Sequence, residues 1–159
     1  MKVLVAEKCG FCPGVRNAIN LAKKTLEKNN VVYSLGPIIH NEDVVRQLAE
    51  TGLHTVSRID EIDTGTVLIR SHGATLAELQ EIHTKGLNVV DATCILVKRV
   101  QKIACLLYDE GYHVIIVGDR NHPEVRAVVG SAPDVDVAGN EVDLSKIWLG
   151  KQFGVICTT

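Results

Sequence analysis

Thiol and imidazole side chains recur in this sequence at one kind of position, directly after a short apolar run. Such side chains bind soft metals and iron–sulfur clusters, and imidazoles also suit phosphate groups. Five segments carry them in chain order: "CGFCPG" with Cys12, "GPIIHN" with His40, "SHGA" with His72, "ATC" with Cys94, and "NHPEV" with His122 and Glu124. What chemistry they support depends on whether the fold brings them together.

Short β-branched runs alternate with helical patterns along the 159 residues. The runs predict strands, and apolar residues at intervals of three and four predict the helices between them. Asn41 is placed to cap one helix, and Thr75 with Glu78 forms a capping box that opens another. The expected strands cover 2–6, 31–35, 66–70, 88–92, 113–118 and 153–159, and the expected helices cover 14–30, 42–51, 76–85, 96–111 and a segment from Pro123. The patterns at 135–138 and 142–149 are weaker.

This alternation predicts an α/β fold with parallel sheets and helices on both faces. We expect a first α/β domain over residues 1–93 and a second over residues 94–159. The second domain ends in the run "FGVICTT" with no helix after it, so we expect it to be truncated.

The carboxyl ends of parallel strands are where open sheets bind ligands. All five reactive segments follow expected strands, so we expect them to share one edge. Taken alone, a loop histidine is more often a surface residue and a cysteine more often a small buried side chain, and Asn121 or His122 could simply cap the helix from Pro123. Chance would scatter such segments over both ends of a sheet, so together they favour a functional site. Cys105 and Cys157 lie inside apolar runs and are expected to pack in the core.

Composition narrows the class of protein. The net charge is −2 and only 4% of residues are aromatic, which gives no case for binding nucleic acid or an anionic membrane surface. No apolar run approaches the ~20 residues of a membrane span, and the N-terminus lacks the apolar core of a signal peptide. An odd number of cysteines without a secretion signal predicts reduced thiols in the cytoplasm.

The closely spaced cysteines are compatible with more than one kind of site. Cys9 and Cys12 form a C-x-x-C pair, but no second pair at zinc-finger spacing exists, so a structural zinc has weak support. Pro13 and Gly14 follow, where a thioredoxin-like motif would open its helix directly. The glycine-rich dinucleotide fingerprint and the P-loop are both missing. Pairing of Cys12 with Cys94 through space is compatible with cluster ligation, and spacing alone does not decide.

Five segments, in order and spacing, resemble those of the 4-hydroxy-3-methylbut-2-enyl diphosphate reductases, the LytB family. They are "GFCPGVRNAI", "GPIIHN", "RSHGA", "DATC" followed by "LVKRVQ", and "NHPEV". The resemblance runs from residue 2 to the end of the chain. It implies the last enzyme of the non-mevalonate isoprenoid pathway, which removes the substrate hydroxyl as water and yields isopentenyl and dimethylallyl diphosphate.

The resemblance also implies a role for each reactive residue. Cys12 and Cys94 match two of the three cysteines that hold a [4Fe-4S] cluster, whose fourth iron is open to the substrate hydroxyl. Glu124 matches the acid that delivers a proton. A ferredoxin or flavodoxin would supply the electrons one at a time. The substrate-binding positions of the family are matched by His40, His72, His122 and Thr158.

The sequence departs from the family pattern at several positions. Ile95 stands where the family has Pro, Cys157 stands where it has Gln, and Cys9 lies outside the usual motif. The third cluster cysteine and the Ser/Asn diphosphate contacts belong to a third domain that we expect to be absent, so an isolated chain is expected to hold no stable cluster and to be inactive. Two other interpretations stay open: a non-catalytic α/β module that binds diphosphate or a metal, and an inactive gene remnant.

Overall fold

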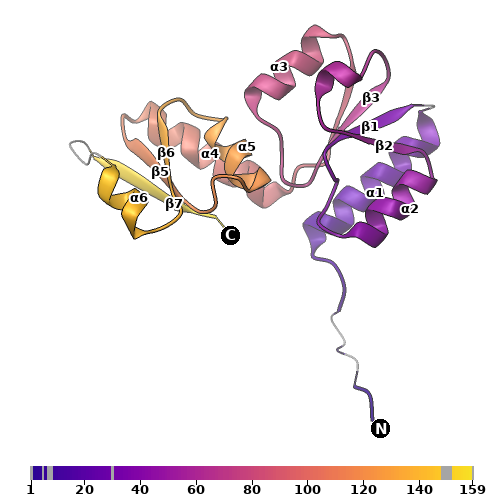
Figure 1. The fold of residues 1–159 in the computed structure, drawn as a ribbon, viewed down its shortest axis with the longest axis horizontal. Coiled ribbons are helices and arrows are strands. Elements are labelled where there is room, and N and C mark those ends of the chain that lie inside the picture. The colour runs from indigo at the N-terminus through magenta and orange to yellow at the C-terminus, as the bar shows by residue number, and fades with distance from the viewer. Residues whose placement is uncertain (1, 5, 7–8, 30, 148–151, 159) are drawn as a thin grey trace.

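The structure, a computed structural model, describes residues 2–4, 6, 9–29, 31–147 and 152–158. Its helices and strands alternate along the chain and form two parallel sheets, which occupy separate halves of Figure 1. The prediction of an α/β fold with parallel sheets is confirmed. Among the described residues, no helix is both long and apolar enough to span a bilayer.

The first sheet has the strand order β2-β1-β3-β4, and every pair in it is parallel. β1 (Val32–Leu35) lies between β2 (Leu53–Val56) and β3 (Thr66–Ile69), and β4 (Asn88–Asp91) pairs with β3. The register aligns the first residue of each strand with the first residue of its neighbour. The carboxyl ends of all four strands therefore lie along one edge.

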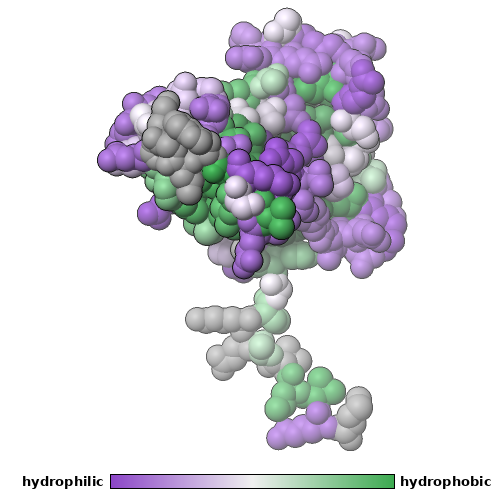
Figure 2. Space-filling model, turned by 60° about the vertical axis from the view of Figure 1, so that its left-hand side comes forward, coloured by the Kyte–Doolittle hydropathy of each residue, from purple (hydrophilic) through white to green (hydrophobic). Residues whose placement is uncertain are grey.

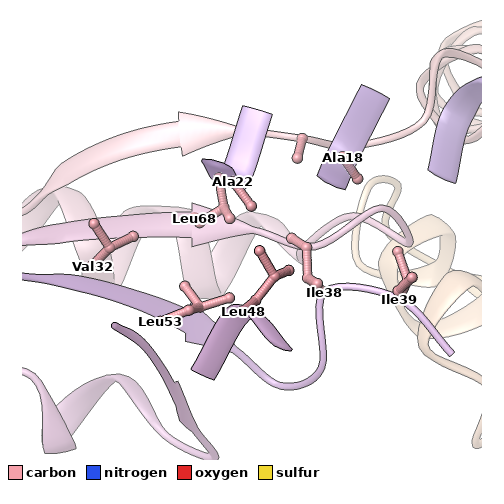
Figure 3. Close-up of a cluster of buried hydrophobic side chains, with 9 residues drawn as sticks. Ala18, Ala22, Val32, Ile38, Ile39, Leu48, Leu53 and Leu68 are labelled. Carbon is pink, nitrogen blue, oxygen red and sulfur yellow. The ribbon is translucent and has the colours of Figure 1, made fainter. Parts of the chain in front are cut away.

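Helices cover both faces of this sheet. α1 (Pro13–Lys28) and α2 (Glu42–Glu50) pack on one face, and the 3₁₀ helix η1 (Ile59–Glu61) and α3 (Leu76–Thr84) pack on the other. Each fully buried aliphatic side chain stabilises the fold by about 1.5–3 kcal/mol, so both faces contribute. The cluster under α1 and α2, shown in Figure 3, consists of Ala18, Ala22, Val32, Ile38, Ile39, Leu48, Leu53, Leu68 and Ala92.

The predicted helix starts in the first half of the chain are confirmed. The Asn41 side chain accepts a hydrogen bond from the Val44 backbone N–H at 3.0 Å and so caps α2. Thr75 and Glu78 exchange hydrogen bonds between side chain and backbone at the start of α3, as a capping box requires.

The second sheet has the strand order β6-β5-β7, again with parallel pairs only. β5 (His113–Val117) is central, β6 (Val135–Ala138) lies on one side and β7 (Phe153–Cys157) lies on the other. The predicted strands at 113–118 and 153–159 are therefore present within the described residues, with residue 159 outside them, and the weaker pattern at 135–138 forms β6.

Three helices accompany this sheet. α4 (Ile95–Asp109) and α5 (Pro123–Val129) pack on one face, where Val114 and Ile116 of β5 meet their buried side chains. The short helix α6 (Glu141–Lys146) contacts β6. It overlaps the weaker pattern at 142–149, of which residues 148–149 lie outside the described residues.

The strand expected at residues 2–6 is wrong for the residues that the structure describes there. Lys2, Val3, Leu4 and Ala6 have no regular structure, and Val3 and Leu4 are mostly exposed. A strand needs a neighbour to accept and donate its backbone hydrogen bonds, and no described strand pairs with this segment. Figure 2 shows the N-terminal segment extending away from the rest of the molecule.

The expectation that Cys105 and Cys157 pack in the core is also wrong. Cys105 is half-buried on α4, and its thiol donates a hydrogen bond to the Ser131 carbonyl oxygen at 3.0 Å. Cys157 is exposed at the end of β7. Side chains alternate along a strand, so when Ile156 enters the core its neighbour Cys157 faces away.

Candidate functional site

In the first sheet, two reactive loops follow adjacent strands at a point where the chain changes direction. β1 leads into α2 on one face, whereas β3 leads into α3 on the opposite face, so the loops after these strands diverge. Such a point leaves a crevice at the carboxyl edge, where ligands bind in open α/β sheets. His40 follows β1 and His72 follows β3.

Three imidazole rings that are distant in the sequence lie together there. The ring centroids of His40 and His72 are 4.3 Å apart. His122, which follows β5 of the second sheet, lies 5.7 Å from His40 and 5.8 Å from His72. Nδ1 of His72 is buried and has no hydrogen-bond partner among the described residues. We call these three residues the histidine cluster.

The electrostatics of the histidine cluster keep the His72 ring uncharged at neutral pH. Burial, and then the charges of His40, His122 and Arg70, lower the pKa of His72 to about 4. Both effects penalise the protonated ring, so His72 is neutral at pH 7. A bound anion would oppose the charge effects because it stabilises an imidazolium. An anion at this place would therefore favour uptake of a proton by His72.

His122 combines membership of the cluster with a structural role. It is the N-cap of α5, and its Nδ1 accepts a hydrogen bond from the backbone N–H of Glu124 at 3.3 Å. In the neutral ring the proton then lies on Nε2. Glu124 stands in the first turn of α5 and is half-buried. The capping hydrogen bond therefore fixes the orientation of the His122 ring. The same ring also belongs to the histidine cluster.

Backbone hydrogen bonds tie the loops of the first sheet to one another. The Ser71 N–H donates to the Ile38 carbonyl at 3.1 Å, and the Cys94 N–H donates to the Ser71 carbonyl at 2.9 Å. These bonds join the loop of His40 to the loop of His72, and that loop to Cys94. The position of one reactive side chain thus constrains the next.

The turn that leads into Cys94 is fixed by Asp91. Its carboxylate accepts a hydrogen bond from the Thr93 backbone N–H at 2.9 Å and forms an ion pair with Lys98 at 2.7 Å. Burial alone would raise the pKa of Asp91, but the hydrogen bonds from Lys98 and Thr93 outweigh it and hold the pKa below its ordinary value. Asp91 therefore stays charged and keeps this turn in place at neutral pH.

Cys12 and Cys94 lie close together at the starts of two helices. Cys12 is the N-cap of α1 and Cys94 is the N-cap of α4, and neither side chain makes a capping hydrogen bond. A Cβ built on Gly14 would lie 2.6 Å from Sγ of Cys94 and 3.9 Å from Sγ of Cys12, so both sulfurs lie within 4 Å of one point. Two helix N-termini favour negative charge at this place, which suits thiolate ligands.

Gly14 leaves the space that the Cys94 thiol fills, which gives a direct prediction. Gly14→Ala is expected to push the Cys94 sulfur away and to lower the yield of a Cys12–Cys94 cross-link formed by a short bifunctional thiol reagent. Helix propensity alone would favour Ala over Gly by about 1 kcal/mol, so the loss of cross-linking is not expected to come from a weaker α1. Asn17→Ala, on the exposed side of α1, is the control. An unchanged yield in Gly14→Ala would contradict the close approach of the two sulfurs.

The thiol pair fits part of a metal centre. Among the described residues no group of three or more His, Cys, Asp or Glu side chains has the arrangement to hold a metal ion. An iron–sulfur cluster is held by cysteine thiolates, and the soft donors Cys12 and Cys94 are of the right kind. The described residues therefore bring together two thiols of the kind that such a group uses, and Cys9, exposed and three residues before Cys12, lies outside this pair.

Thr158 lies in a second crevice, at the carboxyl edge of the second sheet. Its backbone N–H donates to the Val117 carbonyl at 3.1 Å, and its Oγ1 is buried with no partner among the described residues. The crevice has a volume of about 490 Å³. It is lined by the loops after β5 and β6 and by Cys157, and Gly118 leaves room for the Thr158 hydroxyl, which a Cβ would approach to 2.8 Å.

The structure thus brings the seven candidate residues into three groups: the histidine cluster with Glu124 beside His122, the thiol pair, and Thr158 in its own crevice. Sequence reasoning missed the contributions of Gly14 and Arg70. A glycine inside a helix, which costs stability there, was the available signal for Gly14. For Arg70, the available signal was its position in the sequence, two residues before His72.

Comparison with known proteins identifies related chains. The family model of the LytB protein matches residues 3–159. A 4-hydroxy-3-methylbut-2-enyl diphosphate reductase of Geobacter metallireducens is 42% identical over 160 residues, which cover 100% of this chain and 57% of the relative. The reductase of Syntrophotalea carbinolica is 46% identical over 129 residues, or 81% of this chain and 46% of the relative. The chain therefore spans about half the length of these curated relatives.

Solved structures agree with these relatives. A structure of (E)-4-hydroxy-3-methyl-but-2-enyl diphosphate reductase, described as the terminal enzyme of the non-mevalonate pathway, superposes with a TM-score of 0.86 at 38% identity. It is matched over 99% of this chain and 58% of its own. The corresponding reductase from Plasmodium falciparum gives a TM-score of 0.88 at 26% identity, over 96% of this chain and 50% of its own.

Proposed function

Because the chain belongs to the LytB family, we propose that it is the N-terminal portion of a 4-hydroxy-3-methylbut-2-enyl diphosphate reductase. In this proposal it binds the diphosphate of the substrate and supplies two thiolates to an iron–sulfur cluster. The observation that carries the proposal is the histidine cluster, in which the centroids of three imidazole rings lie 4.3 to 5.8 Å from one another and the buried Nδ1 of His72 has no partner among the described residues. We also propose that the two sheets belong to two domains that meet at residues 93–94.

The histidine cluster would act as the diphosphate site. Imidazole N–H groups donate hydrogen bonds to phosphate oxygens, and those bonds become charge-assisted when a ring takes up a proton. His72 is the ring whose protonation the free protein disfavours most clearly, so binding of the diphosphate would charge it. Three donors from three loops would fix the orientation of the diphosphate, and with it the position of the rest of the substrate.

Cys12 and Cys94 would hold two corners of a [4Fe-4S] cluster. When bound, such a cluster supplies electrons and a Lewis-acidic iron that can accept the substrate hydroxyl. We propose that a third thiolate comes from polypeptide beyond these 159 residues, so that the isolated chain holds no stable cluster and is inactive.

The remaining candidate residues would deliver the proton and bind the substrate hydroxyl. Glu124, in the first turn of α5 beside His122, is placed to hold a proton next to the bound diphosphate. The buried Thr158 hydroxyl, with no partner in the described chain, is a group that could bind the substrate hydroxyl. Two electrons are needed for each hydroxyl that leaves as water, and we propose that an external ferredoxin or flavodoxin delivers them singly.

Metal analysis after anaerobic purification tests this proposal. The isolated chain is expected to bind little iron and sulfide, whereas the same chain joined to the C-terminal remainder of the Geobacter metallireducens relative is expected to bind about four irons. That joined protein should show the electron paramagnetic resonance signal of a reduced cluster. It should also convert the allylic diphosphate to isopentenyl and dimethylallyl diphosphate with a reduced viologen dye.

Other outcomes of the same analysis would contradict the proposal. Zinc in place of iron in both proteins would favour a non-catalytic module that binds metal or diphosphate. No metal and no binding of inorganic pyrophosphate in either protein would favour an inactive remnant. Cys12→Ser and Cys94→Ser should each abolish iron loading of the joined protein, and Cys105→Ser, at a half-buried position on α4, is the matched control.

A further inference from the structure

The histidine cluster spans both halves of the molecule, so its geometry depends on how the halves are joined. His40 and His72 belong to loops of the first sheet, whereas His122 caps α5 of the second. Gln101, on α4, bridges them directly. Its Nε2 donates to the Ala127 carbonyl of α5 at 3.1 Å and to the Ala74 carbonyl, two residues after His72, at 3.5 Å.

The chain segments around this bridge are tightly packed. Gly73, with φ of +85°, would bring a Cβ within 3.3 Å of both the Ala127 Cβ and the Thr93 Cγ2. The Leu76 N–H, at the start of α3, lies 3.5 Å from the Gly130 carbonyl at the end of α5. Gln101 therefore sits where the loop of His72 and α5 lie close together, and its amide donates to a backbone carbonyl on each side.

Charged groups of both signs surround this close approach. Arg70, two residues before His72, and Arg126, beside Ala127, both lie near the junction. Burial, together with the charge of Arg126, lowers the pKa of Arg70, while Glu78 opposes that shift. The Glu78 carboxylate also accepts hydrogen bonds from the Thr75 backbone N–H and hydroxyl in the capping box. The attraction of Arg70 to Glu78 is larger than its repulsion by Arg126, so charge does not drive apart the loops that Gln101 connects.

We propose that Gln101 is a positioning residue that sets the spacing between His72 and His122 and thereby the affinity of the histidine cluster for a diphosphate. The part about affinity rests on the proposed function. The part about spacing does not, because it follows from the two carbonyl contacts alone. Gln101 touches neither imidazole in this proposal and acts through the backbone that carries them.

Matched methionine substitutions test the proposal in the 159-residue chain. Gln101→Met keeps the length of the side chain and removes both donors, and Lys102→Met makes the same replacement at the exposed neighbour. Calorimetric titration with inorganic pyrophosphate is expected to show binding about five- to tenfold weaker in Gln101→Met than in Lys102→Met. Gln101→Asn, which keeps the amide on a shorter stem, should fall between them and serves if the methionine variant does not fold.

A second readout separates positioning from a loss of stability. His72 is surrounded by His40, His122 and Arg70, and its protonation is disfavoured partly by their charges. If His122 moves away in Gln101→Met, the titration midpoint of the His72 ring, followed by nuclear magnetic resonance, should rise toward its ordinary value. An unchanged midpoint and unchanged affinity in Gln101→Met would overturn the proposal. A wild-type chain that does not bind pyrophosphate would instead overturn the proposed function, and the midpoint would still decide the role of Gln101.

Discussion

In the chain joined to the C-terminal remainder of its relative, Glu124→Gln is expected to lower turnover of the allylic diphosphate by about 10²–10⁴-fold and to leave its affinity nearly unchanged. The amide has the size of the carboxylic acid, and the backbone N–H of residue 124 would still donate to Nδ1 of His122. An amide cannot deliver a proton at neutral pH. The defect should therefore fall on the chemical step and not on binding.

The position of Glu124 at the start of α5 opposes its proposed role as an acid. The N-terminus of α5 stabilises a carboxylate, which opposes proton donation. The negative diphosphate and a site closed to water act in the other direction. We expect the second pair of effects to dominate once substrate is bound, because a dianionic neighbour in a dry site acts at short range and with little screening.

Steady-state kinetics of the joined protein would decide this role. Its Glu124→Gln variant is compared with its Glu141→Gln variant. Glu141 also stands in the first turn of a helix, α6, and is exposed, so it controls for the loss of one carboxylate at a helix start. kcat should fall only in Glu124→Gln, with KM close to that of the control. Equal losses in binding and turnover would show that Glu124 binds substrate and does not act as the acid.

Elements with strong local signals could be predicted from the sequence. The capping box of Thr75 and Glu78 and the cap at Asn41 are formed by residues close in sequence, and both are present in the structure. β2 and η1 were missed. The strand "LHTV" has only four residues and exposes its two central side chains, so it carries too little periodicity to be recognised. Its pairing with β1 determines it, and pairing is not a local property.

The opposite error occurred at the N-terminus. Residues 2–6 have the composition of a strand, yet the described ones among them pair with no strand. Apolar composition reports a preference for burial, whereas a strand also needs a partner for its backbone groups. Cys157 was misplaced for a related reason, since an apolar run does not reveal which face of an edge strand is covered.

The location of the histidine cluster at a sheet edge could be predicted from the sequence, but the packing of its rings could not. The rule that ligands bind at the carboxyl ends of parallel strands placed His40, His72 and His122 at sheet edges, and the structure puts their rings side by side. For Cys12 the reasoning was wrong, because no strand precedes it among the described residues, and it reaches Cys94 from the start of α1. The burial of His72 and the fit of Gly14 against Cys94 are tertiary properties with no local signal.

Lowering the pH from 6.5 to 4 is expected to destabilise the wild-type chain more than its His72→Asn variant. The pKa of His72 is about 4 in the folded protein and 6.5 when unperturbed. Above pH 6.5 neither state carries this proton, so His72 contributes no pH dependence. Between 6.5 and 4 only the unfolded chain binds it, so the free energy of unfolding falls as the pH falls. Solvent at the half-buried ring weakens the effect, which we expect to reach about 1–2 kcal/mol.

Urea unfolding at a series of pH values measures this difference. The control is His83→Asn, at an exposed position on α3.

Inorganic pyrophosphate tests the second half of the prediction. By stabilising the protonated ring it should raise the unfolding free energy more at pH 5 than at pH 8, and His72→Asn should bind it about 10- to 100-fold more weakly, as expected for loss of one charge-assisted hydrogen bond. If wild type and His72→Asn depend on pH in the same way, and pyrophosphate protects both equally, His72 is not the ring that couples a proton to the anion.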